Sequence, residues 1–184
     1  MNLLCVDTST DTLDIAIIKD NQILDSYSQE MVKGHSSILL QEVDNLLKQN
    51  GLKATDMDAF VSTTGPGSFT GTRVGAAFVM GMARGLGKKA YGISSLKLLA
   101  LNAKEKAKQQ DITTVVPAGR GAYYISSYSW NGEELIEKEK PKRETAEKLN
   151  LYDDKIVYKI PNKWQNFTEE DMERIHIQYI GGQV

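Results

Sequence analysis

The sequence predicts an α/β protein in which a mixed β-sheet packs against helices. Three observations carry this prediction: short apolar or alternating runs fill the first 30 residues, helical periodicity follows, and strands and helices then alternate to about residue 103. The order β-β-β-α-β-α-β-α is typical of a sheet covered by helices. Beyond residue 103 strands dominate, so we expect two parts, residues 1–103 and 104–184.

Three strands form the expected start of the sheet. A short apolar run ends at Asp7, and the alternation of Leu13, Ile15 and Ile17 with their neighbours has the period of a second strand. The polar turn that begins at Lys19 leads into a third strand. We expect these strands over residues 3–6, 13–18 and 23–28.

An amphipathic helix is expected over Ser36–Asn50, and a strand over Met57–Thr63 follows it. The helix is predicted by an apolar stripe at helical spacing and by Asn50-Gly51, a suitable C-terminal cap. The stripe consists of Leu39, Val43, Leu46 and Leu47.

The most specific local pattern is the glycine-rich segment Gly65–Gly71. Pro66 fixes one backbone angle, and the glycines on either side of it permit angles that other residues avoid. Ser68 or Thr70 can cap a following helix, and free N–H groups at such a helix start can hold an anion. The alternative is a tight turn without a ligand. No Lys-Ser/Thr pair follows the glycines, which excludes a P-loop.

A helix rich in small residues is expected over Thr70–Leu86. Gly71 and Gly75 are four residues apart, as are Gly81 and Gly85. Each internal glycine costs roughly 0.5–1 kcal/mol relative to alanine, so the pattern indicates that another backbone approaches closely. That backbone belongs either to this chain or to a partner. An apolar ridge at spacings of four accompanies the glycines: Val74, Phe78 and Met82.

The remaining elements are shorter. A strand over residues 91–93 precedes a helix that Ser94 or Ser95 caps and that extends to about Gln109. The charged stretch 133–148 indicates a solvated surface, and Asn131-Gly132 is a hairpin turn. In the second part we expect strands over residues 112–116, 122–130, 134–138 and 155–160, with helical turns over 145–149 and 169–174.

Composition excludes several classes of protein. With 22 Lys and Arg against 24 Asp and Glu, the net charge of −2 leaves no excess of positive charge for binding nucleic acid. The single cysteine, Cys5, permits neither an internal disulfide nor a zinc site with two thiolates. No apolar run approaches the roughly 20 residues that span a bilayer, and the first residues lack the features of a signal peptide. We therefore expect a soluble, cytoplasmic protein.

Few residues indicate chemistry. Asp7, with the polar residues after it, can bind magnesium or phosphate, or can simply bond the backbone of its own turn. His35 and His176 have no spacing that supports a metal site. No serine is distinguished as a nucleophile.

Taken together, the motifs resemble the TsaB (YeaZ) family, bacterial proteins of tRNA N6-threonylcarbamoyladenosine synthesis at position 37. The resemblance covers residues 1 to about 103. It rests on Leu4–Thr10, His35-Ser36 with Leu39-Leu40, Gly65–Gly71, Arg73–Gly75 and Gly92–Leu96.

The resemblance implies an actin-like ATPase fold of two subdomains, the second reduced, in a non-catalytic relative of the TsaD transferase. Such a chain pairs with TsaD and with the ATPase TsaE, pairs with itself when alone, and meets tRNA only through the complex. It binds no cofactor tightly, and Mg-ATP and metal are expected in the partners. The expected interface residues are His35, Leu39, Val43, Leu46, Gly71, Val74, Gly75, Phe78, Gly81 and Met82. The candidates for a nucleotide or anion contact are Asp7, Thr8, Ser9, Gly65, Gly67 and Ser68.

Departures from related motifs support the non-catalytic interpretation. Ser95 and Leu99 stand where TsaD-like proteins carry a metal-binding histidine pair. Ser9 replaces a glycine that brings phosphates close in actin-like kinases, and Ala118 replaces an aspartate of the family. We therefore expect weak ATP binding or none. The alternatives are an independent ATPase or a glycoprotease-like peptidase, and the missing histidines argue against a metallopeptidase.

Overall fold

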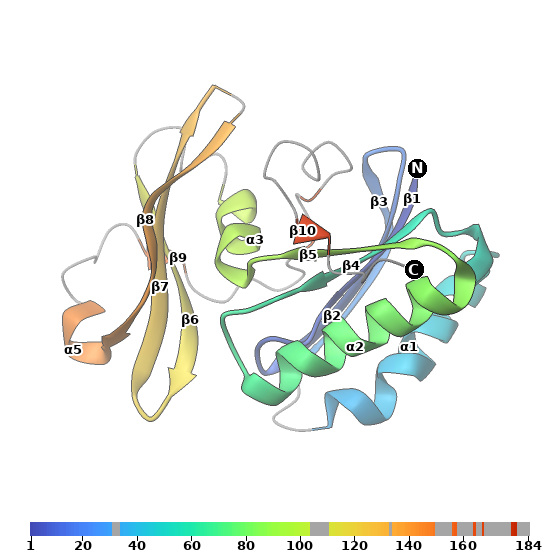
Figure 1. The fold of residues 1–184 in the computed structure, drawn as a ribbon, viewed down its shortest axis with the longest axis horizontal. Helices are drawn as coiled ribbons and strands as arrows, with labels where there is room; N and C mark the ends of the chain where they lie inside the picture. The colour runs from blue at the N-terminus through green and yellow to red at the C-terminus, as the bar shows by residue number, and fades with distance from the viewer. Residues whose placement is uncertain are drawn as a thin grey trace.

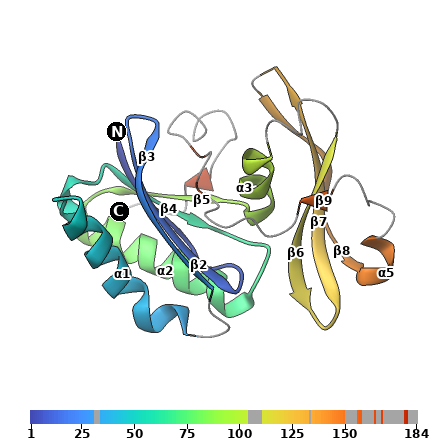
Figure 2. The same ribbon diagram turned by 180° about the vertical axis from the view of Figure 1, so that it is seen from behind.

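The chain forms two β-sheets with one helix between them (Figure 1). The computed structural model describes residues 1–30, 34–103, 111–132, 134–149, 156–157 and 178–179, together with Trp164 and Phe167. Within these residues the first sheet carries two helices on its outer face, and the second sheet stands beside it across the third helix (Figures 1 and 2). The mixed α/β class predicted from the sequence is confirmed.

The first sheet has the strand order β10-β5-β4-β1-β2-β3. The predicted meander is present, because β1, β2 and β3 pair antiparallel, and β1, β4 and β5 then run parallel. The short antiparallel strand β10 was not expected and brings the end of the chain back beside β5. The strands are β1 (Asn2–Asp7), β2 (Thr12–Lys19), β3 (Gln22–Glu30), β4 (Ala59–Thr63), β5 (Lys89–Ile93) and β10 (Gln178–Tyr179).

Two helices cover one face of this sheet, and a third lies on the other. Helices α1 (His35–Gln49) and α2 (Phe69–Leu86) bury their apolar stripes against β1, β2 and β4. Helix α3 (Ser95–Asn102) packs against the opposite face and against the second sheet. The expected extension of α3 to Gln109 falls outside the described residues. A single 3-10 turn, η1 (Ala54–Asp56), precedes β4.

The second sheet has the order β8-β7-β6-β9 and is antiparallel except for the β6–β9 pair. Strand β8 continues to Thr145, well beyond the expected end at Lys138, because it pairs with β7 along its whole length. Its charged residues and Pro141 are tolerated because β8 is an exposed edge strand. The elements are β6 (Ile112–Gly119), β7 (Ala122–Asn131), β8 (Glu134–Thr145), α5 (Ala146–Leu149) and β9 (Ile156–Val157).

The inner face of the first sheet is completed by residues from the end of the chain. Trp164 and Phe167 are fully buried and pack edge to face, with ring centroids 5.3 Å apart. They belong to the same apolar cluster as Cys5, whose burial raises the pKa of its thiol. The predicted helix over 169–174 and His176 lie outside the described residues. No helix among the described residues is both long and apolar enough to cross a membrane.

Replacing Trp164 with alanine is expected to lower the free energy of unfolding by about 3–5 kcal/mol, because it removes a fully buried indole from the inner core. Urea denaturation measures the change. The control is Leu24→Ala, since this side chain on β3 is 45% exposed and its removal should alter stability by less than about 0.5 kcal/mol. Equal effects of the two substitutions would show that Trp164 does not secure the inner face.

Candidate functional site

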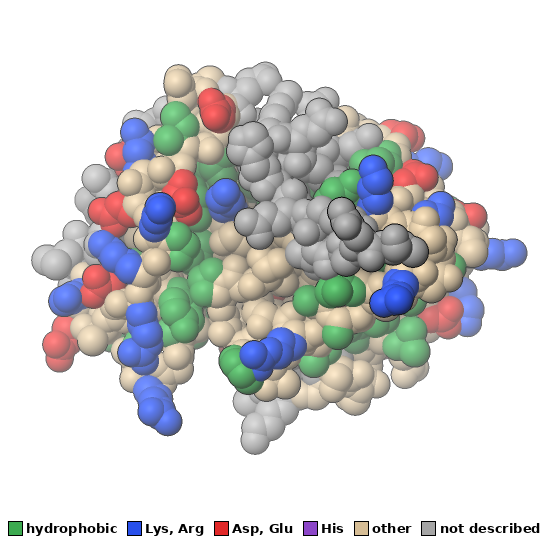
Figure 3. Space-filling view, viewed as in Figure 1, with side chains coloured by type: hydrophobic (Ala, Val, Ile, Leu, Met, Phe, Trp, Pro, Cys, Tyr) green, Lys and Arg blue, Asp and Glu red, His purple; other side chains and the backbone are tan. Residues whose placement is uncertain are grey.

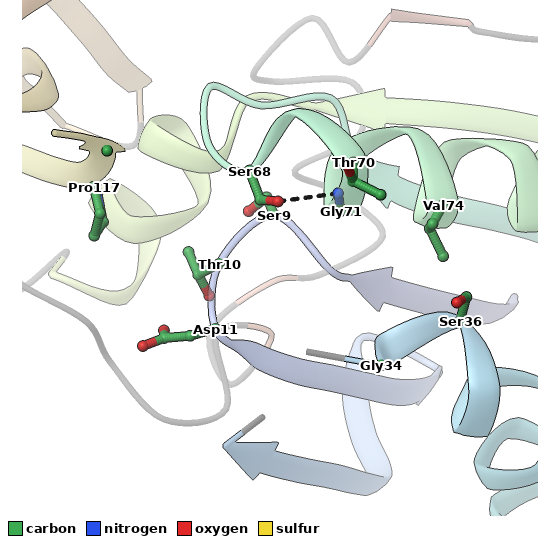
Figure 4. A pocket seen from close by; sticks show the side chains of 11 residues that line it. Ser9, Thr10, Asp11, Gly34, Ser36, Ser68, Thr70, Gly71, Val74 and Pro117 are labelled. Carbon is green, nitrogen blue, oxygen red and sulfur yellow. Dashed lines mark hydrogen bonds between the residues drawn. The ribbon is translucent and has the colours of Figure 1, made fainter. Parts of the chain in front are cut away.

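A cleft of about 580 Å³ lies where α1 and α2 begin, between the β1–β2 turn and the end of β6 (Figure 4). Figure 4 shows Thr10 and Asp11 on one side and the first turns of α2 on the other. Hydroxyl groups and glycine backbone dominate its walls. The lining residues are Ser9, Thr10, Asp11, Gly34, Ser36, Ser68, Thr70, Gly71, Val74, Pro117 and Gly119.

Asp7 is buried at the carboxyl end of β1. Its Oδ1 accepts a hydrogen bond of 2.7 Å from the Ser9 amide and one of 2.6 Å from the Thr63 hydroxyl. The carboxylate thus bonds the backbone of its own turn, one of the two roles that the sequence left open, and the binding of magnesium or phosphate stays a prediction. Sequence reasoning missed Thr63, which reaches Asp7 because β1 and β4 are neighbouring parallel strands.

The turn after Asp7 touches the backbone of α2 directly. The Thr8 hydroxyl donates a 2.6 Å hydrogen bond to the Gly71 carbonyl, and the Ser68 amide donates one of 2.7 Å to the Ser9 carbonyl. A Cβ atom on Gly71 would overlap the Thr8 carbonyl oxygen, and one on Gly75 would lie 2.6 Å from the Thr8 hydroxyl. The backbone that approaches Gly71 thus belongs to this chain, and the groups that approach Gly75 are the hydroxyls of Thr8 and Ser62.

The glycine-rich segment caps α2 as expected. Ser68 is the N-cap residue, and its hydroxyl accepts a 3.1 Å hydrogen bond from the Gly71 amide (Figure 4). A Cβ atom on Gly67 would overlap the Ser9 carbonyl oxygen, and Gly65 has a φ of +91°, so both positions require glycine. The Ser9 carbonyl therefore occupies the space beside Gly67.

The positions that correspond to the histidine pair hold no metal ligand. The Ser95 hydroxyl donates a 2.9 Å hydrogen bond to the Ser9 hydroxyl, and Leu99 is buried. Among the described residues no group of three His, Cys, Asp or Glu side chains can hold a metal ion. A hydroxyl and an isobutyl group do not fit the metal that a histidine pair would bind.

The second sheet contributes backbone rather than charge to the cleft. Pro117 and Gly119 line it from β6, and the turn at Gly119 and Arg120 has positive φ angles. Ala118, where the resemblance implied an aspartate, has no carboxylate. The cleft thus has many hydroxyl groups but no acidic side chain from the second sheet among its lining residues.

The structure corrects part of the expected interface, because five of its ten residues are buried within the chain. Leu39, Val43 and Leu46 are buried in the chain's own core, so they form no partner surface. Gly71 and Gly75 are covered by the β1–β2 turn. The ridge residues are partly buried against the same core: Val74, Phe78 and Met82.

A smaller part of the expected surface stays open. A Cβ atom on Gly81 or Gly85 would meet nothing within 4 Å. The side chain of His35 lies outside the described part of the structure. Three apolar side chains that the sequence pattern missed are exposed on the two helices: Leu40 on α1 at 64%, and Phe69 at 73% and Met80 at 41% on α2. The Arg73 guanidinium lies 3.4 Å from the centre of the Phe69 ring.

Comparisons with known proteins match the chain to a TsaD family model and to TsaB proteins. A sequence model of the family described as TsaD, tRNA N6-adenosine threonylcarbamoyltransferase, matches residues 22–169. The tRNA threonylcarbamoyladenosine biosynthesis protein TsaB of Buchnera aphidicola subsp. Schizaphis graminum is 30% identical over 162 residues, which cover 88% of this chain and 75% of that protein. The TsaB of Escherichia coli is 29% identical over 147 residues, which cover 77% of this chain and 63% of that protein.

A solved structure shows the same fold. YeaZ from Pseudomonas aeruginosa superposes with a TM-score of 0.70 at 27% identity, and the match covers 77% of this chain and 66% of that one. The fold of the actin-like ATPase class that the motifs implied is confirmed by this likeness. The chain spans slightly less than two thirds of the length of the Escherichia coli and Pseudomonas proteins.

Alanine at Gly75 and alanine at Gly81 should change stability in opposite directions, although both glycines lie in α2. At Gly75 the new methyl group meets the hydroxyls of Thr8 and Ser62 at 2.6 and 2.9 Å, and such overpacking typically costs about 1–3 kcal/mol. At Gly81 it meets open space and should stabilise the helix by about 0.5–1 kcal/mol. Thermal and urea denaturation measure both, and a neutral Gly75→Ala variant would contradict the close contact.

Proposed function

The chain belongs to the TsaB family of tRNA threonylcarbamoyladenosine biosynthesis, and from this premise we propose that it is a non-catalytic subunit that pairs with a TsaD-like transferase. It supplies the assembly with a docking surface and contributes no reacting group. A TsaE-like ATPase is the second expected partner, and tRNA is bound through the complex.

The observation that carries the proposal is the exposed apolar surface of α1 and α2. Leu40, Phe69 and Met80 are three of the five large apolar side chains that are exposed among the described residues. Figure 3 shows apolar side chains among lysines and arginines over this helical layer. Exposed apolar residues gathered on one layer are typical of a protein–protein contact.

Two glycines of α2 leave a shallow space on this surface. Gly81 and Gly85 leave space on the outer side of α2, where the backbone of another helix can come close. Two helices from each partner form a four-helix bundle, which buries about 1,200–2,000 Å² in total if the interface is of standard size. In the absence of the transferase, a second copy of this chain binds to the same surface.

The state of the cleft supports the absence of catalysis. The Ser9 amide is bonded to Asp7, the Ser68 amide to the Ser9 carbonyl, and the Ser95 hydroxyl to Ser9. These two amides and this hydroxyl, which lie in the expected nucleotide or anion region, are thus engaged within the chain. Mg-ATP and the metal are accordingly assigned to the partner subunits.

The competing function is an enzyme, either an independent ATPase or a peptidase. One structural relative from Pseudomonas aeruginosa is described as similar to the peptidase YeaZ, with a TM-score of 0.71. No arrangement of the described residues favours either activity. ATP hydrolysis that requires magnesium and is abolished by Asp7→Ala would identify an ATPase.

The isolated chain is expected to bind Mg-ATP with a dissociation constant of about 1 mM or weaker. A phosphate group needs converging amide donors and a magnesium anchor, and Ser9 and Ala118 stand where the resemblance implies a glycine and an aspartate that would supply them. Isothermal titration calorimetry measures this directly. A dissociation constant in the low micromolar range would contradict the proposal that the cleft is inactive.

Replacing Gly81 with leucine should weaken the pairing with the transferase, because it fills open space on the proposed contact side at a cost of about 1–3 kcal/mol. Met80→Glu should act in the same direction by placing a charge in the contact. Co-purification with the transferase, and formation of modified tRNA with TsaD-like and TsaE-like partners, measure the effect.

The matched control for these variants is Leu24→Glu, which changes an exposed apolar residue on β3 that belongs to neither helix. All three variants must retain a cooperative melt after allowance for any lost dimer contact. If folded Gly81→Leu and Met80→Glu proteins pair as well as the control, the partner surface lies elsewhere.

A further inference from the structure

Thr8 stands between the cleft and the helix that carries the proposed partner surface. Its side chain is fully buried, and its hydroxyl donates a 2.6 Å hydrogen bond to the Gly71 carbonyl in the first turn of α2. The same hydroxyl is the atom nearest to the position that a Cβ on Gly75 would take, one turn further along. One side chain thus contacts two successive turns of the helix.

The hydrogen bond from Thr8 is directional, as is the one from the Ser68 amide to the Ser9 carbonyl at the N-cap of α2, and the packing of the later turns is not. Val79 and Ala83 hold the later turns through apolar contacts, which tolerate sliding and rotation. A hydrogen bond of 2.6 Å to a carbonyl in a closely packed glycine groove fixes both the distance and the angle. Because threonine is branched at Cβ, its hydroxyl is also held in few rotamers.

The positions of the exposed side chains of α2 depend on the direction of the helix axis. Phe69 and Arg73 flank Gly71, and Met80 lies nine residues further on, about 13 Å along the helix axis. A tilt of about 10° at the first turn therefore displaces the Met80 side chain by about 2 Å. A well-packed interface does not absorb a shift of this size without losing contacts.

We propose that Thr8 is a positioning residue for the partner: its hydroxyl sets the direction of α2 and thereby the geometry of the surface that binds the transferase. The inference rests on the proposed function. Thr8 contacts no partner itself and acts only through α2.

A matched control separates positioning from plain stability. The Ser126 hydroxyl, buried in the second sheet, also donates a 2.6 Å hydrogen bond to a backbone carbonyl, that of Glu139. Ser126→Ala therefore deletes a bond of the same kind on β7, a strand of the second sheet. Thr8→Val deletes the hydroxyl with little change of shape, and Thr8→Ser keeps it.

The experiment measures the dissociation constant of each full-length variant for the TsaD-like transferase, at a temperature at which all the proteins are folded. We expect Thr8→Val to weaken binding at least tenfold, and Ser126→Ala and Thr8→Ser to bind within about twofold of wild type. Amide hydrogen exchange should quicken over residues 69–75 in Thr8→Val and not in Ser126→Ala. If Thr8→Val does not fold, the dissociation constants of Thr8→Ala and wild type are compared in trimethylamine N-oxide, which favours the compact state. The same weakening of at least tenfold is then expected for Thr8→Ala.

The outcomes distinguish the two proposals. If wild type binds the transferase and folded Thr8→Val binds within twofold of it, the positioning role is overturned and the proposed function stands. If Ser126→Ala weakens binding as much as Thr8→Val does, the effect is one of stability, and the positioning role is again overturned. If wild type does not bind the transferase at all, the proposed function fails and the inference fails with it.

Discussion

The contact between the β1–β2 turn and the backbone of α2 is the constraint on which the rest of the structure depends. It brings Thr8 against Gly71 and Gly75, and it leaves no space for a side chain at either glycine. The next residue, Ser9, is joined to α3 through Ser95, and α3 packs against the second sheet. One turn of polar residues therefore joins α2, the first sheet and, through α3, the second sheet.

The same contact supports the proposal that this chain is not catalytic, although it has a cleft. The hydrogen bonds that close the turn engage the Ser9 and Ser68 amides and the Ser95 hydroxyl within the chain. Each satisfies a polar group that would otherwise be costly to bury. On this account the chain is stable without a ligand in its cleft, and the outer surface of α2 is already in place when the partner arrives.

The sequence predicted the helices and strands of residues 1–103 well. It predicted less well which surface packs against each of them. Periodicity identifies the buried side of α1 from Leu39, Val43 and Leu46, yet it does not say whether this chain or a partner covers that side. Likewise Gly71 and Gly81 share one spacing pattern, but only the fold places the Thr8 turn against the first and leaves the second open. The return of Trp164 and β10 to the first sheet depends on contacts between distant residues, which carry no local signal.

The central claim is that the chain contributes a surface and not a reacting group. Formation of N6-threonylcarbamoyladenosine in tRNA, reconstituted from TsaD-like and TsaE-like partners with either wild type or an Asp7→Asn variant, tests it most directly. Asparagine keeps the oxygen that accepts the hydrogen bonds from Ser9 and Thr63 and removes the charge that magnesium would need. The account predicts the wild-type level of modification with the variant and a loss of modification when the chain is omitted. A folded, partner-bound Asp7→Asn protein that supports no more modification than the omitted chain would contradict it.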